Sequence, residues 1–292
     1  MPSMSYSAVD FGLRNRDLLV VIVAFQHGFT NQVLQLKQAM EPPVVARLYL
    51  IMTIFDWSLK TVRGQGIWEH IKQFNTLCEL WLATLCSQND ISRHLQSAPY
   101  MEDVLLVYAA TTGNLSLLQR GFQHPDAWLT TVVNKTQRNL STSKICRVLM
   151  DLAAWSGHVH IVDYIASQPL IESPFRATAG LHGAASNGHL EVVQYLTAHG
   201  CQSDEAIEYA AAKGHYDVVL FLRSGPYSRE AVIQAAENGH LECVKCLMEN
   251  YHGDSRHDIA NLVAEAAILH GHSEIVTFLQ DWLTQRDEYT VR

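Results

Sequence analysis

A short frame recurs in the second half of the chain and constrains the fold more than any other feature. In each copy an alanine pair, replaced by Ala267-Ile268 in the last copy, is followed by two other residues and then by a glycine and a histidine. Apolar residues recur after the histidine. The glycine–histidine pairs are Gly157-His158, Gly188-His189, Gly214-His215, Gly239-His240 and Gly271-His272. A sixth copy, residues 109–118, has Asn114 instead of histidine, and its frame breaks at Gly121. Such a period predicts a repeat architecture.

Each part of the frame suits a unit of two helices. The small alanines let a neighbouring helix pack closely, and the glycine supplies the left-handed backbone that ends the first helix. Apolar residues then recur at helical spacing, which predicts a second helix with one buried face. Acidic residues stand in its first turn, where they favour the helix dipole: Glu191, Asp217, Glu242 and Glu274. One hairpin cannot bury its apolar face alone, so the hairpins must stack into a solenoid.

These residues resemble the ankyrin repeat family, whose repeat runs Thr-Pro-Leu-His-x-Ala-Ala-x-x-Gly-His-x-Glu-x-Val. The nearest match to its opening is Leu181-His182-Gly183-Ala184-Ala185, with Ala179-Gly180 in place of Thr-Pro. The resemblance covers residues 105–283 and implies an all-α, ankyrin-type solenoid of helical hairpins. We therefore expect a repeat array over 105–292, with five clear copies and one degenerate copy. Residues 1–104 are expected to form a helical N-terminal region of degenerate repeats or a cap.

The spacing of the frame departs from that of the family. Successive glycines are 44, 31, 26, 25 and 32 residues apart, against roughly 33 for an ankyrin unit. The short units leave little room for the projecting hairpin fingers of the family, so we expect tight turns at 200–203 and 225–228. The longest interval predicts an insertion between Gln123 and Ser143.

Charge differs between the two halves of the chain. Residues 148–292 carry 8 Lys and Arg against 19 Asp and Glu, whereas residues 1–147 carry 13 against 10. The acidic half argues against binding to nucleic acid or to an anionic membrane, both of which need a cationic surface. We expect a neutral or basic protein partner.

Apolar runs and cysteines bear on the compartment. No apolar run is long enough to cross a bilayer, and the six cysteines show no disulfide spacing. We expect a cytoplasmic protein, with the nucleus as the alternative compartment. The sequence gives no prediction of oligomeric state.

Two groups of residues invite a chemical interpretation. Cys243-x-x-Cys246 has the spacing of a redox pair or of half a zinc site, but both cysteines occupy apolar positions of the repeat, which favours burial as small hydrophobes. The cluster His252, Asp254, His257 and Asp258 suits either metal ligation or a turn.

The frame histidines are better explained by structural hydrogen bonds of the turn than by metal binding or a pH switch. Phosphate-loop, dinucleotide-binding and nucleophile signatures are missing from the sequence. We expect no catalytic residue, no metal, no cofactor and no enzymatic activity.

The resemblance implies a protein-binding scaffold that uses the short turns, the exposed side of the first helix and the two residues before each Gly-His pair. The corresponding candidates are Trp155, Ser156, Ser186, Asn187, Asp204, Lys213, Arg229, Glu237, Asn238 and His270. Trp155 is either an exposed hot spot of the interface or a residue that packs against the insertion at 123–143.

An alternative function is a substrate-selecting adaptor of a ubiquitin ligase. Glu41-Pro42-Pro43, followed by Val44, Val45, Leu48 and Ile54, distantly resembles an F-box opening, although the Leu-Pro start and the characteristic spacing are absent. In this hypothesis the N-terminal region recruits the ligase and the repeats select its target.

Overall fold

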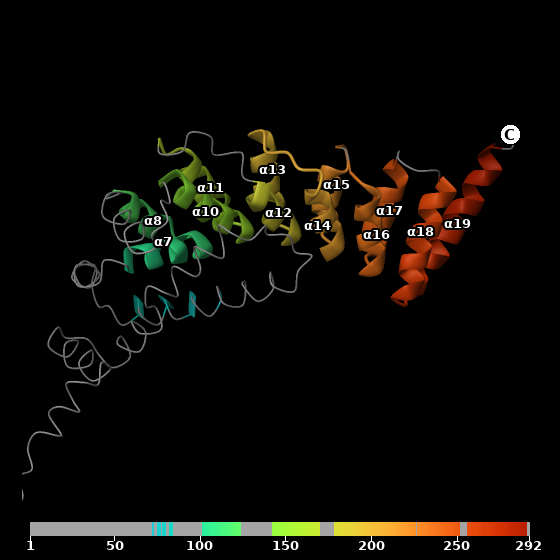
Figure 1. The fold of residues 1–292 in the computed structure, drawn as a ribbon, viewed down its shortest axis with the longest axis horizontal. Helices are drawn as coiled ribbons and strands as arrows, with labels where there is room; N and C mark the ends of the chain where they lie inside the picture. The colour runs from blue at the N-terminus through green and yellow to red at the C-terminus, as the bar shows by residue number, and fades with distance from the viewer. Residues whose placement is uncertain are drawn as a thin grey trace, which may run out of the picture.

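A computed structural model describes residues 72, 75, 76, 78, 79, 82, 83, 101–123, 142–169, 178–225, 227–251 and 256–290. The regular structure of these residues is entirely α-helical, which confirms the predicted fold class. Twelve helices form six successive pairs (Figure 1). They are α7 (Met101–Thr112), α8 (Leu115–Phe122), α10 (Thr142–Trp155), α11 (Val159–Ala166), α12 (Thr178–Ser186), α13 (Leu190–Ala198), α14 (Ala206–Lys213), α15 (Tyr216–Leu222), α16 (Arg229–Glu237), α17 (Leu241–Asn250), α18 (Arg256–Leu269) and α19 (Ser273–Thr290).

The pairs stack into two layers, as expected of a helical solenoid. The first helices of the pairs, α7, α10, α12, α14, α16 and α18, contact one another in chain order and form one layer. The second helices from α11 to α19 contact one another in the same order and form the other layer. Each second helix also packs on the first helix of its own pair. None of the helices in the described ranges is long and apolar enough to cross a membrane.

The alanine pairs explain how closely the first helices approach. In the five pairs that precede another described pair, both alanines are completely buried: Ala109-Ala110, Ala153-Ala154, Ala184-Ala185, Ala210-Ala211 and Ala235-Ala236. The last pair differs, because Ala267 is buried but Ile268 is 64% exposed. A larger side chain is accommodated there because no described helix packs on that side of α18.

The frame histidines connect each repeat to the repeat before it. In three copies the imidazole Nε2 lies 2.8–3.1 Å from a backbone carbonyl oxygen two residues before the preceding frame glycine, and donates a hydrogen bond to it. The pairs are His158 with Thr111, His215 with Ser186, and His272 with Glu237. The rings of His189 and His240 bond the equivalent carbonyls of Trp155 and Ala212.

The same imidazole also covers the preceding glycine. A Cβ atom on Gly188 would lie 2.6 Å from Nδ1 of His215. The frame glycines at 113, 157, 214 and 239 are covered just as closely, each by the frame histidine of the following repeat. Each of these glycines has a φ near +80°, so glycine is required both by backbone conformation and by space. We call the imidazole, the glycine and the carbonyl together a histidine joint.

The histidine joint confirms that the frame histidines make structural hydrogen bonds, but it corrects where the acceptor lies. The acceptor belongs to the preceding repeat rather than to the histidine's own turn. Burial lowers the pKa of His158, His189 and His240 below that of a solvated imidazole. These rings are therefore neutral at pH 7.

The first described repeat departs from the frame in two ways. Asn114 replaces the histidine, and its side chain caps α8 by accepting a hydrogen bond from the amide of Leu117. The sequence frame breaks at Gly121, but α8 continues to Phe122. A Cβ atom on Gly121 would lie 2.5 Å from Cδ2 of Leu106, so this glycine lets α8 approach α7.

The connections between repeats are short where the sequence predicted tight turns. Residues 199–205 join α13 to α14, with Gly200 at φ +87°, and residues 223–228 join α15 to α16. The predicted insertion falls mainly on residues 124–141, outside the described residues. Most of the region 1–104 lies outside them too, but Thr111 of α7 donates a hydrogen bond of 2.8 Å to Oδ1 of Asn75.

Candidate partner-binding surface

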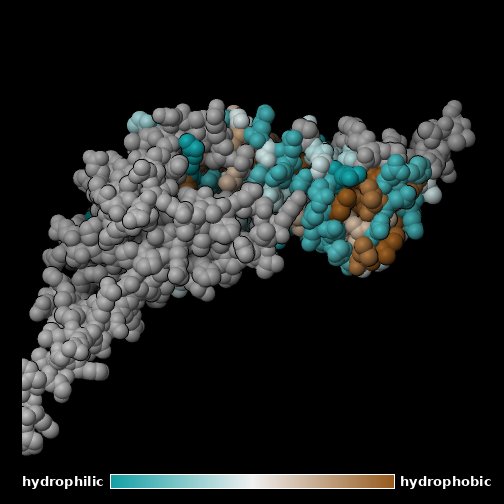
Figure 2. All heavy atoms as spheres, in the orientation of Figure 1, coloured by the Kyte–Doolittle hydropathy of each residue, from teal (hydrophilic) through white to brown (hydrophobic). Residues whose placement is uncertain are grey.

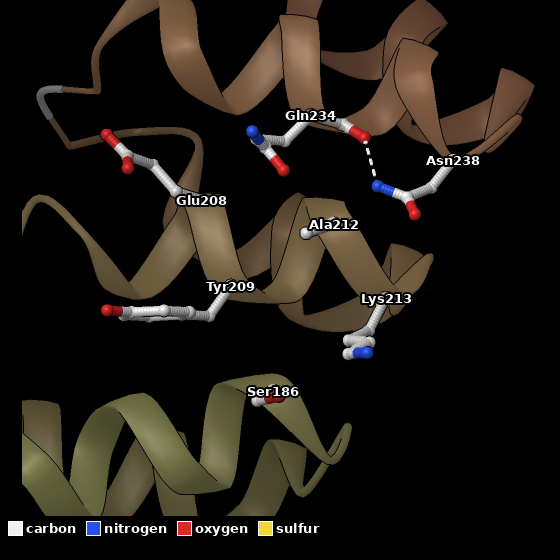
Figure 3. A pocket seen from close by; sticks show the side chains of 7 residues that line it. All are labelled: Ser186, Glu208, Tyr209, Ala212, Lys213, Gln234 and Asn238. Carbon is white, nitrogen blue, oxygen red and sulfur yellow. Dashed lines mark hydrogen bonds between the residues drawn. The ribbon is translucent and has the colours of Figure 1, made fainter. Parts of the chain in front are cut away.

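A hollow of about 250 Å³ lies on the layer of first helices and spans three successive repeats (Figure 3). It is lined by Ser186 of α12, by Glu208, Tyr209, Ala212 and Lys213 of α14, and by Gln234 and Asn238 of α16. Pockets for small molecules usually enclose about 300–1,000 Å³ and are mostly apolar. This hollow is smaller, and most of the residues that line it are polar, which suits one polar side chain better than a small molecule.

Ala212 creates the hollow. It lies two residues before Gly214, and the corresponding residues of other repeats are Trp155, Ser186, Glu237 and Leu269. Because alanine carries only a methyl group, the long side chains of α14 and α16 surround an unfilled space above it (Figure 3).

Hydrogen bonds orient the polar groups around the hollow. The Gln234 amide donates to Oε1 of Glu230 at 2.9 Å, and the Asn238 amide donates to the backbone oxygen of Gln234 at 2.8 Å. The Gln234 amide oxygen points toward Ala212 (Figure 3), and each amide keeps a second N–H donor. Glu208 accepts a bond from the Ser228 hydroxyl, which holds its carboxylate at the edge of α16.

Ser186 contributes a buried hydroxyl to the wall of the hollow. The residue is 3% exposed, and its Oγ has no hydrogen-bond partner among the described residues. A buried hydroxyl without a partner costs about 1–3 kcal/mol. A ligand that supplies the missing bond would remove that cost.

The structure brings together three of the ten sequence candidates, Ser186, Lys213 and Asn238. Half-buried Glu237 precedes Asn238 in α16, while exposed Asp204 and Arg229 lie at the starts of α14 and α16. Lys213 is exposed at the end of α14.

Sequence reasoning missed three residues of the hollow: Glu208, Tyr209 and Gln234. A signal for them was present, since they stand one helical turn before Ala212, Lys213 and Asn238. On the exposed side of the first helix, the candidate positions therefore extend one turn further back from the two residues that precede each Gly-His pair.

The hypothesis that Trp155 is an exposed hot spot is wrong, because this side chain is only 4% exposed. Its ring packs over Gly183 of α12, where a Cβ atom would lie 2.9 Å from the ring carbon Cε3. The absence of a side chain on Gly183 gives the indole its space. The backbone oxygen of Trp155 accepts a hydrogen bond of 3.0 Å from the Asn187 side-chain amide.

The remaining candidates lie away from the hollow. Ser156 and Asn187 are half-buried at the turns after α10 and α12. His270 is exposed in the last repeat, and its Nδ1 lies 3.0 Å from the carbonyl oxygen of Ala266. None of these three residues lines the hollow.

The two cysteines of the Cys-x-x-Cys motif lie in the core, as predicted. Cys243 is 1% exposed and Cys246 is 4% exposed. Burial raises the pKa of the Cys243 thiol to about 11, so the thiolate needed for redox or metal chemistry is scarce at neutral pH. These thiols pack as small hydrophobes.

The other predicted chemical cluster falls partly outside the described residues. His257 and Asp258 are exposed at the start of α18, whereas residues 252 and 254 are not described. Within the described ranges, no three His, Cys, Asp or Glu residues are grouped so that they could hold a metal ion. The F-box-like segment 41–54 also lies outside the described residues.

Comparison with known proteins agrees with the geometry of the array. The family model described as ankyrin repeats (3 copies) matches twice, over residues 149–228 and 208–286. No curated protein matches the chain. The matched residues contain α11 to α18 and all five clear frame copies. The second half of this chain, from residue 149 to residue 286, therefore belongs to the ankyrin repeat family.

Proposed function

We propose that the array is a non-enzymatic binding module that holds a partner protein on its layer of first helices, with the hollow above Ala212 at the centre of the interface. Ankyrin repeats as a family mediate protein–protein interaction. The observation that carries the proposal is the hollow itself, because it collects polar side chains from three successive repeats around one accessible space.

The contrast between constant and variable positions supports this choice of surface. The five histidine joints repeat the same glycine and imidazole and are explained by stability alone. The residues around the hollow differ between copies, and Lys213 and Asn238 are both exposed. Recognition is the function that a variable polar surface on a fixed framework can supply.

The charge of the array indicates the kind of partner. Residues 148–292 have eleven more acidic than basic side chains, and like charges repel across an interface. We infer a partner that is neutral or basic where it meets the first helices, in a complex that forms inside the cell.

Filling the hollow tests the proposal. Ala212→Leu places a larger side chain at a position where other repeats carry tryptophan or glutamate, so the fold should tolerate it. The matched control is Ala198→Leu, at an exposed alanine on the other layer. Proximity labelling in the native cell with the full chain should give proteins whose labelling falls at least tenfold with Ala212→Leu and is retained with Ala198→Leu.

The proposal fails if no labelled protein distinguishes the two variants. Purified candidates must then reproduce the difference as direct binding, with a Kd raised about tenfold by Ala212→Leu, which corresponds to 1.4 kcal/mol. Circular dichroism and thermal melting of both variants separate a loss of binding from a loss of folding.

A further inference from the structure

The outer side of α18 carries a straight stripe of exposed residues. Asp258, Leu262, Glu265 and Leu269 follow one another at steps of four, three and four residues and are all exposed, which places them on one face of the helix. We call these four residues the edge stripe. Carboxylates and leucines alternate along it, and exposed Ile268 lies beside it. Figure 2 shows the apolar surface at this end of the array.

Internal repeats show what this face of a first helix does when another repeat follows. Trp155, which is equivalent to Leu269, packs on α12 of the next repeat. Glu208, which is equivalent to Glu265, accepts a hydrogen bond from Ser228 of the next repeat. Among the described helices, α16 and α19 pack on α18, and they leave the edge stripe exposed. The edge stripe is therefore a stacking face without a described neighbour.

The residues of this face suit neither a polar cap nor a further repeat. A terminal repeat needs a polar outer face, but Leu269 and Ile268 are the two most exposed large apolar residues of the described chain. A following repeat packs closely on alanine, as buried Ala236 shows, and Ile268 stands at that position. Contiguous apolar side chains on an exposed face are typical of an interaction site.

The second helix of the same repeat has a polar edge. Thr277 and Gln280 stand at the positions from which Asp163 and Arg223 of earlier repeats contact the next second helix. Both are exposed and uncharged polar residues. The apolar surface therefore ends at α18, which suits a single helix of a partner better than a pair of helices.

The order of residues in the edge stripe disfavours a second copy of this chain as the occupant. If two stripes met in parallel, each carboxylate would face a carboxylate. If they met in antiparallel register, Asp258 would face Leu269 and Glu265 would face Leu262, so each carboxylate would lose its water against a leucine. A partner that meets these two carboxylates favourably carries positive charge.

We propose that the edge stripe of α18 binds an amphipathic helix of a partner protein, in which apolar residues alternate with lysine or arginine. Such a helix binds through anchors at helical spacing. Its apolar residues cover Leu262 and Leu269, and its cations pair with Asp258 and Glu265. The hollow is lined by α12, α14 and α16, so this surface is separate from it and the inference goes beyond the proposed function.

The test uses the full chain and a designed, alanine-rich helical peptide, acetylated and amidated, with one face that alternates leucine and lysine at steps of four and three residues. Isothermal titration calorimetry measures its binding, and the methyl NMR signals of Leu262 and Leu269 locate it. The leucine–lysine peptide should shift both signals. A peptide with glutamate in place of lysine, and one with the same composition in scrambled order, should each bind about tenfold more weakly, which corresponds to 1.4 kcal/mol.

Variants of the chain locate the contact. Leu269→Gln should weaken binding of the leucine–lysine peptide about tenfold, and the matched control Leu220→Gln, at an exposed leucine of α15 on the other layer, should leave binding unchanged. Glu265→Gln should weaken binding and reduce its dependence on salt. The matched control Glu191→Gln, at an exposed carboxylate of α13, should do neither. Thermal melting checks that each variant remains folded.

Several results would overturn the proposal. The leucine–lysine peptide could fail to bind, or it could bind no better than the glutamate and scrambled peptides. Equal weakening by Leu269→Gln and Leu220→Gln would show that the peptide does not recognise the edge stripe. A full chain that sediments as a dimer, and as a monomer with Leu269→Gln, would make a second copy the occupant.

This proposal and the proposed function can fail separately. Ala212→Leu should leave binding of the leucine–lysine peptide unchanged, and a loss of binding with this variant would place the peptide in the hollow and overturn the edge proposal. If Ala212→Leu leaves labelling of every partner unchanged while Leu269→Gln weakens binding of the peptide, the hollow is not the interface and the edge proposal stands.

Discussion

The joints inside the array and the free edge of the last repeat have the same sequence frame but different surroundings. Gly188 lies under the imidazole of the next repeat, whereas a Cβ atom on Gly271 would have no neighbour within 4 Å. Both glycines have a φ between +75° and +78°. The comparison separates two reasons for the frame glycine: a left-handed backbone at every copy, and contact with the following histidine only inside the array.

The same difference appears at the alanine pair. Ala236 is completely buried beneath α18, and the equivalent residue of the last repeat, Ile268, is 64% exposed. Leu269 beside it is 75% exposed. These residues form part of the apolar surface near the C-terminal end of the array (Figure 2). Small residues are thus needed where another repeat packs, and the need ends where the stack ends.

Among substitutions that test this comparison, one at the internal glycine Gly188 should change the free energy of unfolding most. Gly188→Ala should lower the free energy of unfolding by about 3 kcal/mol, because the left-handed backbone costs about 1–2 kcal/mol and the displaced His215 ring leaves a buried carbonyl without its bond. Gly271→Ala should cost only about 1 kcal/mol, from the backbone alone. Urea unfolding measures both, and equal losses would show that the histidine contact is unimportant.

A pair of opposite changes at the alanine position should have the next largest effect. Ala236→Ile overpacks the contact between α16 and α18 and should cost about 2 kcal/mol, within the usual range for core overpacking. Ile268→Ala removes an exposed side chain and should change the unfolding free energy by less than about 0.5 kcal/mol. A large loss from Ile268→Ala in the purified protein would mean that this edge is covered.

Acidification should weaken the internal joints. The lowered pKa values of His158, His189 and His240 mean that the folded array takes up protons less readily than the unfolded chain. Their contribution to stability is complete above the unfolded pKa of about 6.5 and is lost as the pH falls through the folded values.

The carboxyl group of Asp151 gives stability the opposite pH dependence, so the measurement needs a variant without this group. Burial raises the pKa of Asp151 to about 7, so its contribution is complete below its unfolded value and lost as the pH rises through about 7. In an Asp151→Asn background, the urea midpoint should fall between pH 7 and pH 5. It should fall less when His240→Gln is added, since a glutamine amide can donate without titrating. A midpoint that rises on acidification would contradict the assigned direction.

Much of the fold follows from the sequence because its determinants are local. Glycine, the alanine pair and the apolar stripe act within one hairpin, and they predicted the helix pairs and their stacking. The acceptor of His215 was not predictable in the same way, because Ser186 stands 29 residues earlier and is brought close only by the stack. The burial of Trp155 likewise depends on Gly183, a residue of the next repeat.

The candidate site was predicted in part for the same reason. Counting back from each Gly-His pair identified Ser186, Lys213 and Asn238, because the frame fixes which residues precede the turn. The hollow itself depends on a difference between copies, the methyl group of Ala212 among longer side chains from two helices. A repeat pattern emphasises what copies share, and it therefore conceals the position at which one copy differs.

A double-mutant cycle between Gly188→Ala and His215→Ala tests the histidine joint most directly. Once the His215 ring is absent, Gly188→Ala has only its backbone cost left, so its effect on the free energy of unfolding should shrink from about 3 to about 1 kcal/mol. The account predicts a coupling of about 2 kcal/mol between the two positions, far above the ~0.3–0.5 kcal/mol typical of independent sites. Additive effects of the two substitutions would contradict it.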